Sequence, residues 1–281
     1  MSSVPPRPRS RRQAVLAGLV ALVVALGLIL LPSASSASSR RGSAPKPTVV
    51  LVHGAFADAS GWADVTTKLQ RRGYTVIAPA NPLRGVASDS TYIASVLASI
   101  KGPIVLAGHS YGGEVITNAA LGNPQVKALV YVAAFAPAEG ETSGALSTKY
   151  PGSQLTEENL VFRPFPISAK ETGLDAYINP AVFREVFCAD LSERTAAAMA
   201  ATQRPGALST LGEPSGKPAW KTIPSWYLVA KQDHAIPPAS QRFMAQRMKA
   251  HTREINSSHV AMISHPGVVA DLIQDAARAT R

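Results

Sequence analysis

Short apolar runs alternate with longer segments of helical periodicity through most of this 281-residue chain. The first run, Thr48–Val52, is an uninterrupted β-branched and aliphatic stretch, and residues 60–72 follow it with apolar positions at helical spacing. Each crossover between parallel strands needs a long connection, usually a helix, so this alternation is typical of a parallel sheet with helices on both faces. The sequence therefore predicts an α/β fold with a buried, mostly parallel sheet.

The pattern predicts six strands and, in one long connection, a cap. We expect strands at 48–52, 74–78, 103–107, 126–134, 226–230 and 252–256, and helices at 60–72, 88–100, 112–121, 238–250 and 266–278. Ser88 or Asp89 is expected to cap the second of these helices. Residues 138–223 contain no strand-like run but show helical patterns around 173–178, 180–187 and 191–202, so they are expected to form a helical cap inserted into a domain spanning 48–281.

The N-terminus predicts an export signal. Four arginines precede an apolar stretch at 14–31, and Pro32 and a run of small residues follow it. This order is typical of a secretory signal peptide, here residues 1–37 with cleavage after Ala37, followed by a flexible linker at 38–47. An uncleaved anchor is the alternative, because 18 apolar residues reach the lower limit for crossing a bilayer. Both interpretations predict a secreted or extracytoplasmic protein that contacts the membrane only through this segment, if uncleaved.

Composition excludes several other classes of protein. The formal charge is +10, but residues 1–46 carry seven basic residues and no acidic one, so the remaining chain is nearly balanced. No basic stripe with interleaved aromatics follows, and we expect no nucleic-acid partner. Cys188 is the only cysteine, which excludes an internal disulfide, and no metal-ligand spacing occurs elsewhere. We therefore expect neither a metal nor another cofactor.

A nucleophile motif stands at the third predicted strand-to-helix junction. Residues 108–113 read Gly-His-Ser-Tyr-Gly-Gly, which satisfies G-x-S-x-G with a strand before it and a helix after it. A residue on so tight a turn exposes its side chain above the sheet, and glycine neighbours leave room for the backbone. Ser110 is therefore predicted to be the nucleophile.

A serine nucleophile needs a base to take its proton and a carboxylate to orient that base. Asp233 follows the predicted strand 226–230, and His259 follows the predicted strand 252–256, at the sheet edge where α/β folds bind ligands. These two residues are predicted to complete the triad. Asp175 and Asp190 lie in the inserted segment and are expected to be solvated charges, whereas His53 and His109 are expected to pack or to bond backbone.

Two backbone N–H groups should stabilise the oxyanion that forms at the substrate carbonyl. One is expected from Tyr111, the residue after the nucleophile. The other is expected from Ala55 in the loop that ends the first strand, where Gly54 lets the chain turn back over Ser110.

The motifs at 50–55, 108–113, 233–237 and 258–260 together resemble the α/β-hydrolase superfamily, in particular small capped esterases such as plant methyl-ester hydrolases and their bacterial relatives. The resemblance extends from Val49 to the last helix. It implies a Ser110–His259–Asp233 triad, an oxyanion hole at Ala55 and Tyr111, and a cap at 138–223. The first strand follows the linker directly, so we expect a minimal sheet of about six strands.

The predicted activity is hydrolysis of small carboxylic esters through an acyl-enzyme, with a small-molecule ester as partner. Seven of the 17 aromatic residues lie in the inserted segment, where any single one is expected to belong to the small core of that segment. Aromatics of this segment are also expected to give the cavity apolar walls that favour hydrophobic or aromatic substrates. Two alternatives stay open: a cofactor-free perhydrolase or haloperoxidase using the same triad, and a non-catalytic ligand-binding protein of this fold. A hydroxynitrile lyase fits less well, because Val260 stands where lyases resembling this chain carry a lysine. The sequence leaves the substrate's acyl and alcohol groups and the oligomeric state open.

Overall fold

The computed structural model describes residues 45–280. The predicted signal peptide and most of the predicted linker lie outside the described residues. Six parallel strands form the main sheet, in the order β2 (Val76–Ile77), β1 (Thr48–Val52), β3 (Ile104–Ser110), β4 (Val126–Ala134), β8 (Ser225–Ala230) and β9 (His251–Ile255). The predicted minimal, mostly parallel sheet of about six strands is confirmed.

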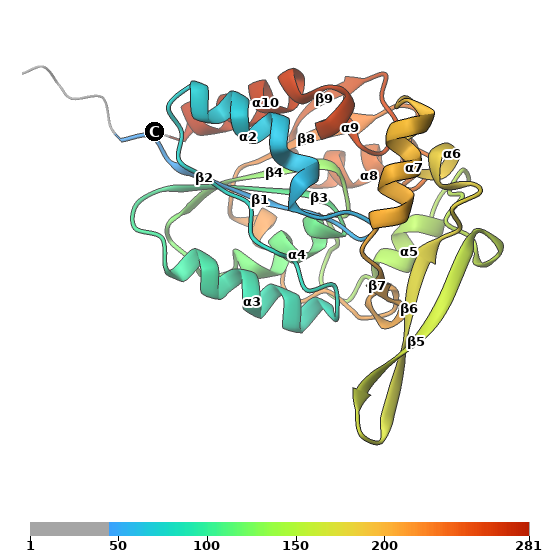
Figure 1. Ribbon diagram of the computed structural model, residues 1–281. Helices are drawn as coiled ribbons and strands as arrows, with labels where there is room; N and C mark the ends of the chain where they lie inside the picture. The colour runs from blue at the N-terminus through green and yellow to red at the C-terminus, as the bar shows by residue number, and fades with distance from the viewer. Residues whose placement is uncertain (1–44, 281) are drawn as a thin grey trace, which may run out of the picture. The chain divides into compact units, whose positions relative to one another are not determined.

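Helices cover both faces of this sheet (Figure 1). One face carries η1 (Ala59–Trp62), α2 (Ala63–Arg71), α9 (Ala261–Ser264) and α10 (Pro266–Ala279), and the other carries α3 (Val86–Ala98), α4 (Tyr111–Ala119) and α8 (Pro238–Arg247). Side chains of a strand alternate between faces, so Val49 and Leu51 of β1 join one apolar core while Val50 and Val52 join the other. Both faces of the sheet are thus buried, as continuous apolar strands require.

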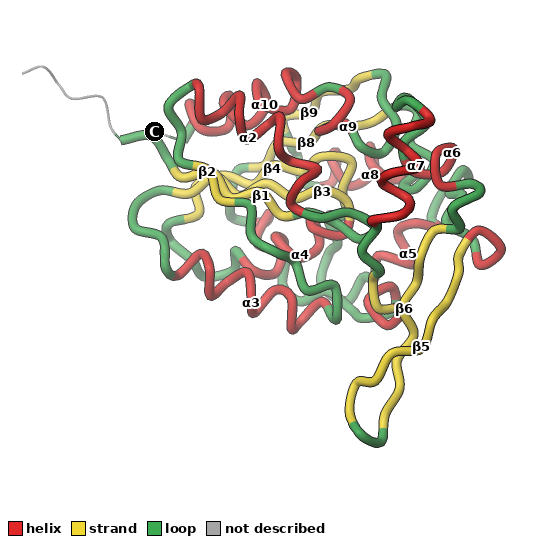
Figure 2. Tube along the Cα trace, viewed as in Figure 1, coloured by secondary structure: helices red, strands yellow, loops and turns green. Residues whose placement is uncertain are grey.

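The long connection between β4 and β8 combines helices with a second sheet. Its elements are α5 (Ser143–Thr148), η2 (Glu157–Asn159), β5 (Leu160–Ser168), β6 (Glu171–Ile178), α6 (Phe183–Phe187), α7 (Glu193–Thr202), β7 (Gly206–Ala207), η3 (Leu208–Leu211) and η4 (Ala219–Lys221). Strands β5, β6 and β7 pair antiparallel in that order. Figure 2 shows the β5–β6 hairpin extending away from the main sheet.

This hairpin corrects the expectation of an all-helical cap without strands, including the helix predicted at 173–178. Pro164 and Pro166 argue against a strand, because proline cannot donate to a sheet ladder. Strand β5 is an edge strand, however, where a missing donor is tolerated. Eight residue pairs, from Leu160 with Ile178 to Ser168 with Glu171, hold the hairpin together.

Helix α3 begins at Val86, two residues before the predicted cap. The carboxylate of Glu213 accepts hydrogen bonds from the backbone N–H of Val86 at 2.6 Å and of Ala87 at 2.9 Å. Glu213, from the long connection between β4 and β8, therefore accepts from the free N–H groups at the helix N-terminus, the role predicted for Ser88 or Asp89. Among the described residues, no helix is both long and apolar enough to cross a membrane.

Candidate active site

Ser110 lies where β3 runs directly into α4. Its φ of 55° and ψ of −126° lie in a region that non-glycine residues seldom occupy, so the turn is strained. The strain persists because the turn is tightly packed: a Cβ on Gly112 would lie 2.5 Å from the carbonyl oxygen of Val52. The side chain that this turn presents at the end of β3 is the predicted nucleophile.

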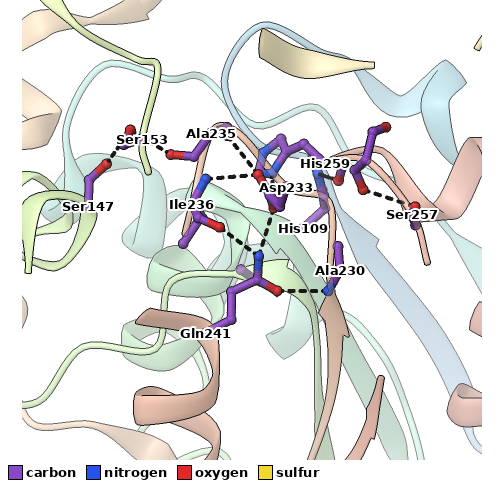
Figure 3. A network of polar contacts seen from close by, with 12 residues as sticks. His109, Ser147, Ser153, Ala230, Asp233, Ala235, Ile236, Gln241, Ser257 and His259 are labelled. Carbon is purple, nitrogen blue, oxygen red and sulfur yellow. Dashed lines mark hydrogen bonds and ion pairs between the residues drawn. The ribbon is translucent and has the colours of Figure 1, made fainter. Parts of the chain in front are cut away.

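Asp233 and His259 meet at the same end of the sheet, just beyond β8 and β9 (Figure 3). His259 Nδ1 lies 2.7 Å from Asp233 Oδ2, and both side chains are almost wholly buried. The carboxylate also accepts from the backbone N–H of Ala235 and Ile236 on Oδ1, and from Gln241 Nε2 on Oδ2. Because Asp233 accepts at Oδ2, His259 Nδ1 carries the proton and Nε2 is left to accept another one.

The turn that carries Ser110 contacts the loop that carries His259. His109 Nε2 lies 3.0 Å from the carbonyl oxygen of His259, and the two imidazole rings lie 4.6 Å apart. Ser110 Oγ has no hydrogen bond with any other described residue. The structure therefore shows no direct hydrogen bond between Ser110 and His259, which does not exclude Ser110 as a nucleophile, since such bonds are often long in free enzymes.

Phe187, at the end of α6, covers the imidazole of His259. The two ring centres lie 5.1 Å apart, and Phe187 also contacts His109 at 6.4 Å. Burial, followed by the proximity of His259, places the pKa of His109 well below its usual value, so His109 is a neutral neighbour of His259. The sequence predicted Phe187 to lie in the core of the inserted segment or in the cavity wall, and no local pattern distinguishes it from the other aromatics there.

Gly54 lies directly against Ser110. A Cβ on Gly54 would lie 2.6 Å from Ser110 Cβ, so only glycine allows so close an approach. Ala55 and Tyr111 line the same cavity as Ser110. The Tyr111 side chain is held by a 2.9 Å hydrogen bond to Asp89, which is buried within α3 rather than capping it.

The cavity above Ser110 has a volume of about 170 Å³ and lies between the main sheet and the inserted segment. None of the described residues that line it is charged or a histidine. The inserted segment contributes four leucines to its wall: Leu155, Leu160, Leu208 and Leu211. The expectation that the aromatics of the inserted segment supply the walls is wrong. The aromatic residues that line the cavity, Phe56, Tyr111 and Phe135, all lie outside that segment.

Asp175 and Asp190 each bind other side chains or backbone groups, whereas the sequence predicted solvated charges. Asp175 lies on β6 and forms a 2.7 Å salt bridge with Arg84. Asp190 is exposed, yet its carboxylate accepts a hydrogen bond from the backbone N–H of Ser258 at 3.1 Å and another from the Ser258 hydroxyl. Neither forms a hydrogen bond with His259 among the described residues, so Asp233 is the one of the three that pairs with this histidine. No group of three His, Cys, Asp or Glu side chains that could hold a metal ion occurs within residues 45–280.

Comparisons with known proteins agree with this architecture. The family model for the alpha/beta hydrolase family matches residues 49–272. An alpha/beta hydrolase of Aspergillus novofumigatus, nvfD, is 25% identical over 83% of this chain and 97% of its own. A pyrethroid hydrolase of Sphingobium wenxiniae is 29% identical over 82% and 88%. The crystal structure of polyneuridine aldehyde esterase superposes with a TM-score of 0.71 at 21% identity, covering 82% of this chain and 99% of that one.

Proposed function

This chain belongs to the alpha/beta hydrolase family, and we propose that it hydrolyses small, uncharged carboxylic esters through an acyl-enzyme on Ser110. The observation that carries the proposal is the buried 2.7 Å contact between His259 Nδ1 and Asp233 Oδ2 at the edge of the sheet where Ser110 stands. A buried carboxylate that fixes one tautomer of a histidine gives that histidine a free Nε2 lone pair for a proton. The relative named pyrethroid hydrolase supports hydrolysis as the reaction.

In the proposed mechanism His259 Nε2 takes the hydroxyl proton as Ser110 Oγ attacks the ester carbonyl carbon. The carbonyl π electrons move onto oxygen, and the backbone N–H groups of Ala55 and Tyr111 donate to that oxyanion. Collapse of the tetrahedral species breaks the bond to the alcohol, which leaves with the proton from His259. Water then attacks the acyl-enzyme by the same steps, and the acid is released as Ser110 regains its proton.

The lining of the cavity supports the choice of substrate class. A charged acyl or alcohol group would lose its hydration in a cavity whose lining offers no opposite charge. The leucine and phenylalanine walls favour apolar groups of small size, aliphatic or aromatic. No step of the proposed reaction requires a cofactor.

A panel of p-nitrophenyl and methyl esters tests the proposal. We expect turnover of neutral, apolar esters, and little turnover of esters of equal length that carry a terminal carboxylate. Ser110→Ala is expected to abolish turnover while the fold and thermal stability are retained. Binding of these esters without release of alcohol, or full activity in Ser110→Ala, would refute the proposed function.

A further inference from the structure

His53, at the end of β1, is a fully buried histidine that contacts the loop above the nucleophile. Its Nε2 lies 2.9 Å from the backbone nitrogen of Asn81, and its Nδ1 lies 2.9 Å from the carbonyl oxygen of Gly54. A backbone N–H only donates, so Nε2 is the unprotonated acceptor and Nδ1 carries the proton that it donates to Gly54. Burial is the main cause that lowers the pKa of His53, which favours the same neutral form.

Asn81 holds the backbone of His53 as well as its ring. Its side-chain Nδ2 donates to the carbonyl oxygen of His53 at 2.9 Å, and Asn81 is fully buried. The two residues therefore exchange hydrogen bonds between the residue that follows β1 and the loop that follows β2. This pair gives the imidazole one position and one tautomer.

The carbonyl that His53 holds belongs to the Gly54–Ala55 peptide. This peptide is trans, so the N–H of Ala55 points away from the oxygen of Gly54. Within the described residues the Ala55 N–H donates to no other group, and Ala55 lines the cavity with Ser110. Fixing the Gly54 oxygen on the His53 side thus directs the Ala55 N–H to the opposite side of the peptide.

Because residue 54 is glycine, the orientation of the Gly54–Ala55 peptide depends on a hydrogen bond that holds it. Gly54 lacks the Cβ that restricts other residues, so rotation of the Gly54–Ala55 peptide meets little steric resistance. A rotated peptide would turn a carbonyl oxygen toward the developing oxyanion, where it would repel negative charge. We infer that His53, held by Asn81, is a positioning residue that keeps the Ala55 N–H available to the oxyanion. This inference rests on the proposed function, because it concerns the oxyanion hole of that reaction.

Two substitutions of His53 separate its two hydrogen bonds. The amide nitrogen of asparagine can take the place of Nδ1, so His53→Asn keeps the donor to Gly54 and loses the acceptor for Asn81. The amide of glutamine reaches the place of Nε2, so His53→Gln keeps the acceptor for Asn81 and loses the donor to Gly54. Each variant leaves one buried backbone group unpaired, and their losses of stability should be similar.

We expect His53→Gln to lower kcat by roughly 10–10²-fold with KM within about threefold, and His53→Asn to lower it much less. A trifluoromethyl ketone forms a hemiketal when Ser110 Oγ adds to its carbonyl carbon, and the former carbonyl oxygen becomes an oxyanion in the hole. Affinity for this inhibitor should fall with kcat. His251→Gln, at an exposed histidine on β9, is the matched control and should retain activity. Equal kcat and equal inhibitor affinity in His53→Gln and His53→Asn would overturn the inference.

A measurement on the unmodified protein covers the case in which the variants do not fold. NMR of protein labelled with ¹⁵N in its histidine rings should show His53 protonated at Nδ1 and unprotonated at Nε2 at neutral pH. The opposite tautomer, or a protonated ring, would overturn the inference. Fluorophosphonate labelling of wild-type protein reports on the proposed function separately, so a labelled enzyme with unaffected His53 variants would reject only the role of His53.

Discussion

Replacing Asp233 with asparagine changes one atom and should disable the base. Oδ1 of Asp233 accepts from the backbone N–H of Ala235 at 2.7 Å and of Ile236 at 2.9 Å, and these donors cannot move aside. The asparagine carbonyl must therefore take the Oδ1 position, which directs its NH₂ group toward His259 Nδ1. Because two donors cannot share a hydrogen bond, His259 must give up its Nδ1 proton and become protonated at Nε2.

Gln241 cannot relieve this conflict by rotating its amide. Its Oε1 accepts from the backbone N–H of Ala230 at 3.0 Å, and its Nε2 donates to the carbonyl of Ile236 as well as to Asp233. One Gln241 donor is therefore left facing the new NH₂ group. The unpaired buried donor should lower the free energy of unfolding by about 1–3 kcal/mol.

With Nε2 protonated, His259 has no lone pair for the proton of Ser110. The same substitution in a serine protease lowers kcat about 10⁴-fold. We expect Asp233→Asn to lower kcat by on the order of 10²–10⁴-fold, or about 3–5 kcal/mol of transition-state stabilisation, with KM little changed. Steady-state kinetics with a p-nitrophenyl ester, run well below the melting temperature of the variant, would measure this loss.

Asp190→Asn is the matched control. Its amide oxygen can still accept from the Ser258 N–H, and water can reach the exposed side chain, so kcat should stay within about threefold of wild type. If Asp190→Asn lost activity and Asp233→Asn kept it, the assignment of the acid to Asp233 would be refuted, and the inserted segment would contribute the acid instead.

Three further predictions concern other parts of the chain. A fluorophosphonate should add one group per chain, at Ser110, as read by peptide mass spectrometry, and an adduct at another serine would contradict the proposed nucleophile. Burial raises the pKa of Glu114 to about 8, although the nearby Ser143 hydroxyl opposes this shift. Neither carboxylate oxygen has a partner at hydrogen-bond geometry among the described residues. The folded state therefore keeps a proton that the unfolded chain loses above about pH 4.5. The free energy of unfolding should fall by roughly a few kcal/mol as the pH rises toward about 8. Glu114→Gln should flatten that profile in urea denaturation, and an unchanged profile would show that Glu114 is not the cause. The proposed export signal predicts a new N-terminus near Ser38 when the full chain is expressed in a bacterial host, whereas full-length protein found only in membranes would favour the anchor.

Local patterns were sufficient to predict the main sheet and the residues at its edge. Strand-forming and helix-forming segments differ in the period of their apolar residues, which is a property of the chain itself. The turn at Ser110 depends on the glycines beside it. Ser110, Asp233 and His259 each lie at or just beyond the end of a different strand, so their places in the sequence give their places along the sheet. Because all parallel strands end on the same edge, their juxtaposition could be predicted without any packing detail.

Contacts between distant segments decided the rest. The β5–β6 hairpin forms although Pro164 and Pro166 interrupt its first strand, because β5 lies at the edge of its sheet. Helix α3 begins at Val86 because Glu213, 127 residues away, accepts its N–H groups.

The lining of the cavity was also decided by packing. Some apolar residues of the inserted segment pack in the core beside the main sheet, and others line the cavity, although their hydrophobicity is the same. Phe187 therefore covers His259 while Leu208 and Leu211 line the cavity, although the sequence marks all three only as apolar. The spacing of apolar residues and the residue types of a turn are local properties, so they can be predicted from the sequence. The face that a segment buries depends on its packing against residues far away in sequence, so only the tertiary structure decides it.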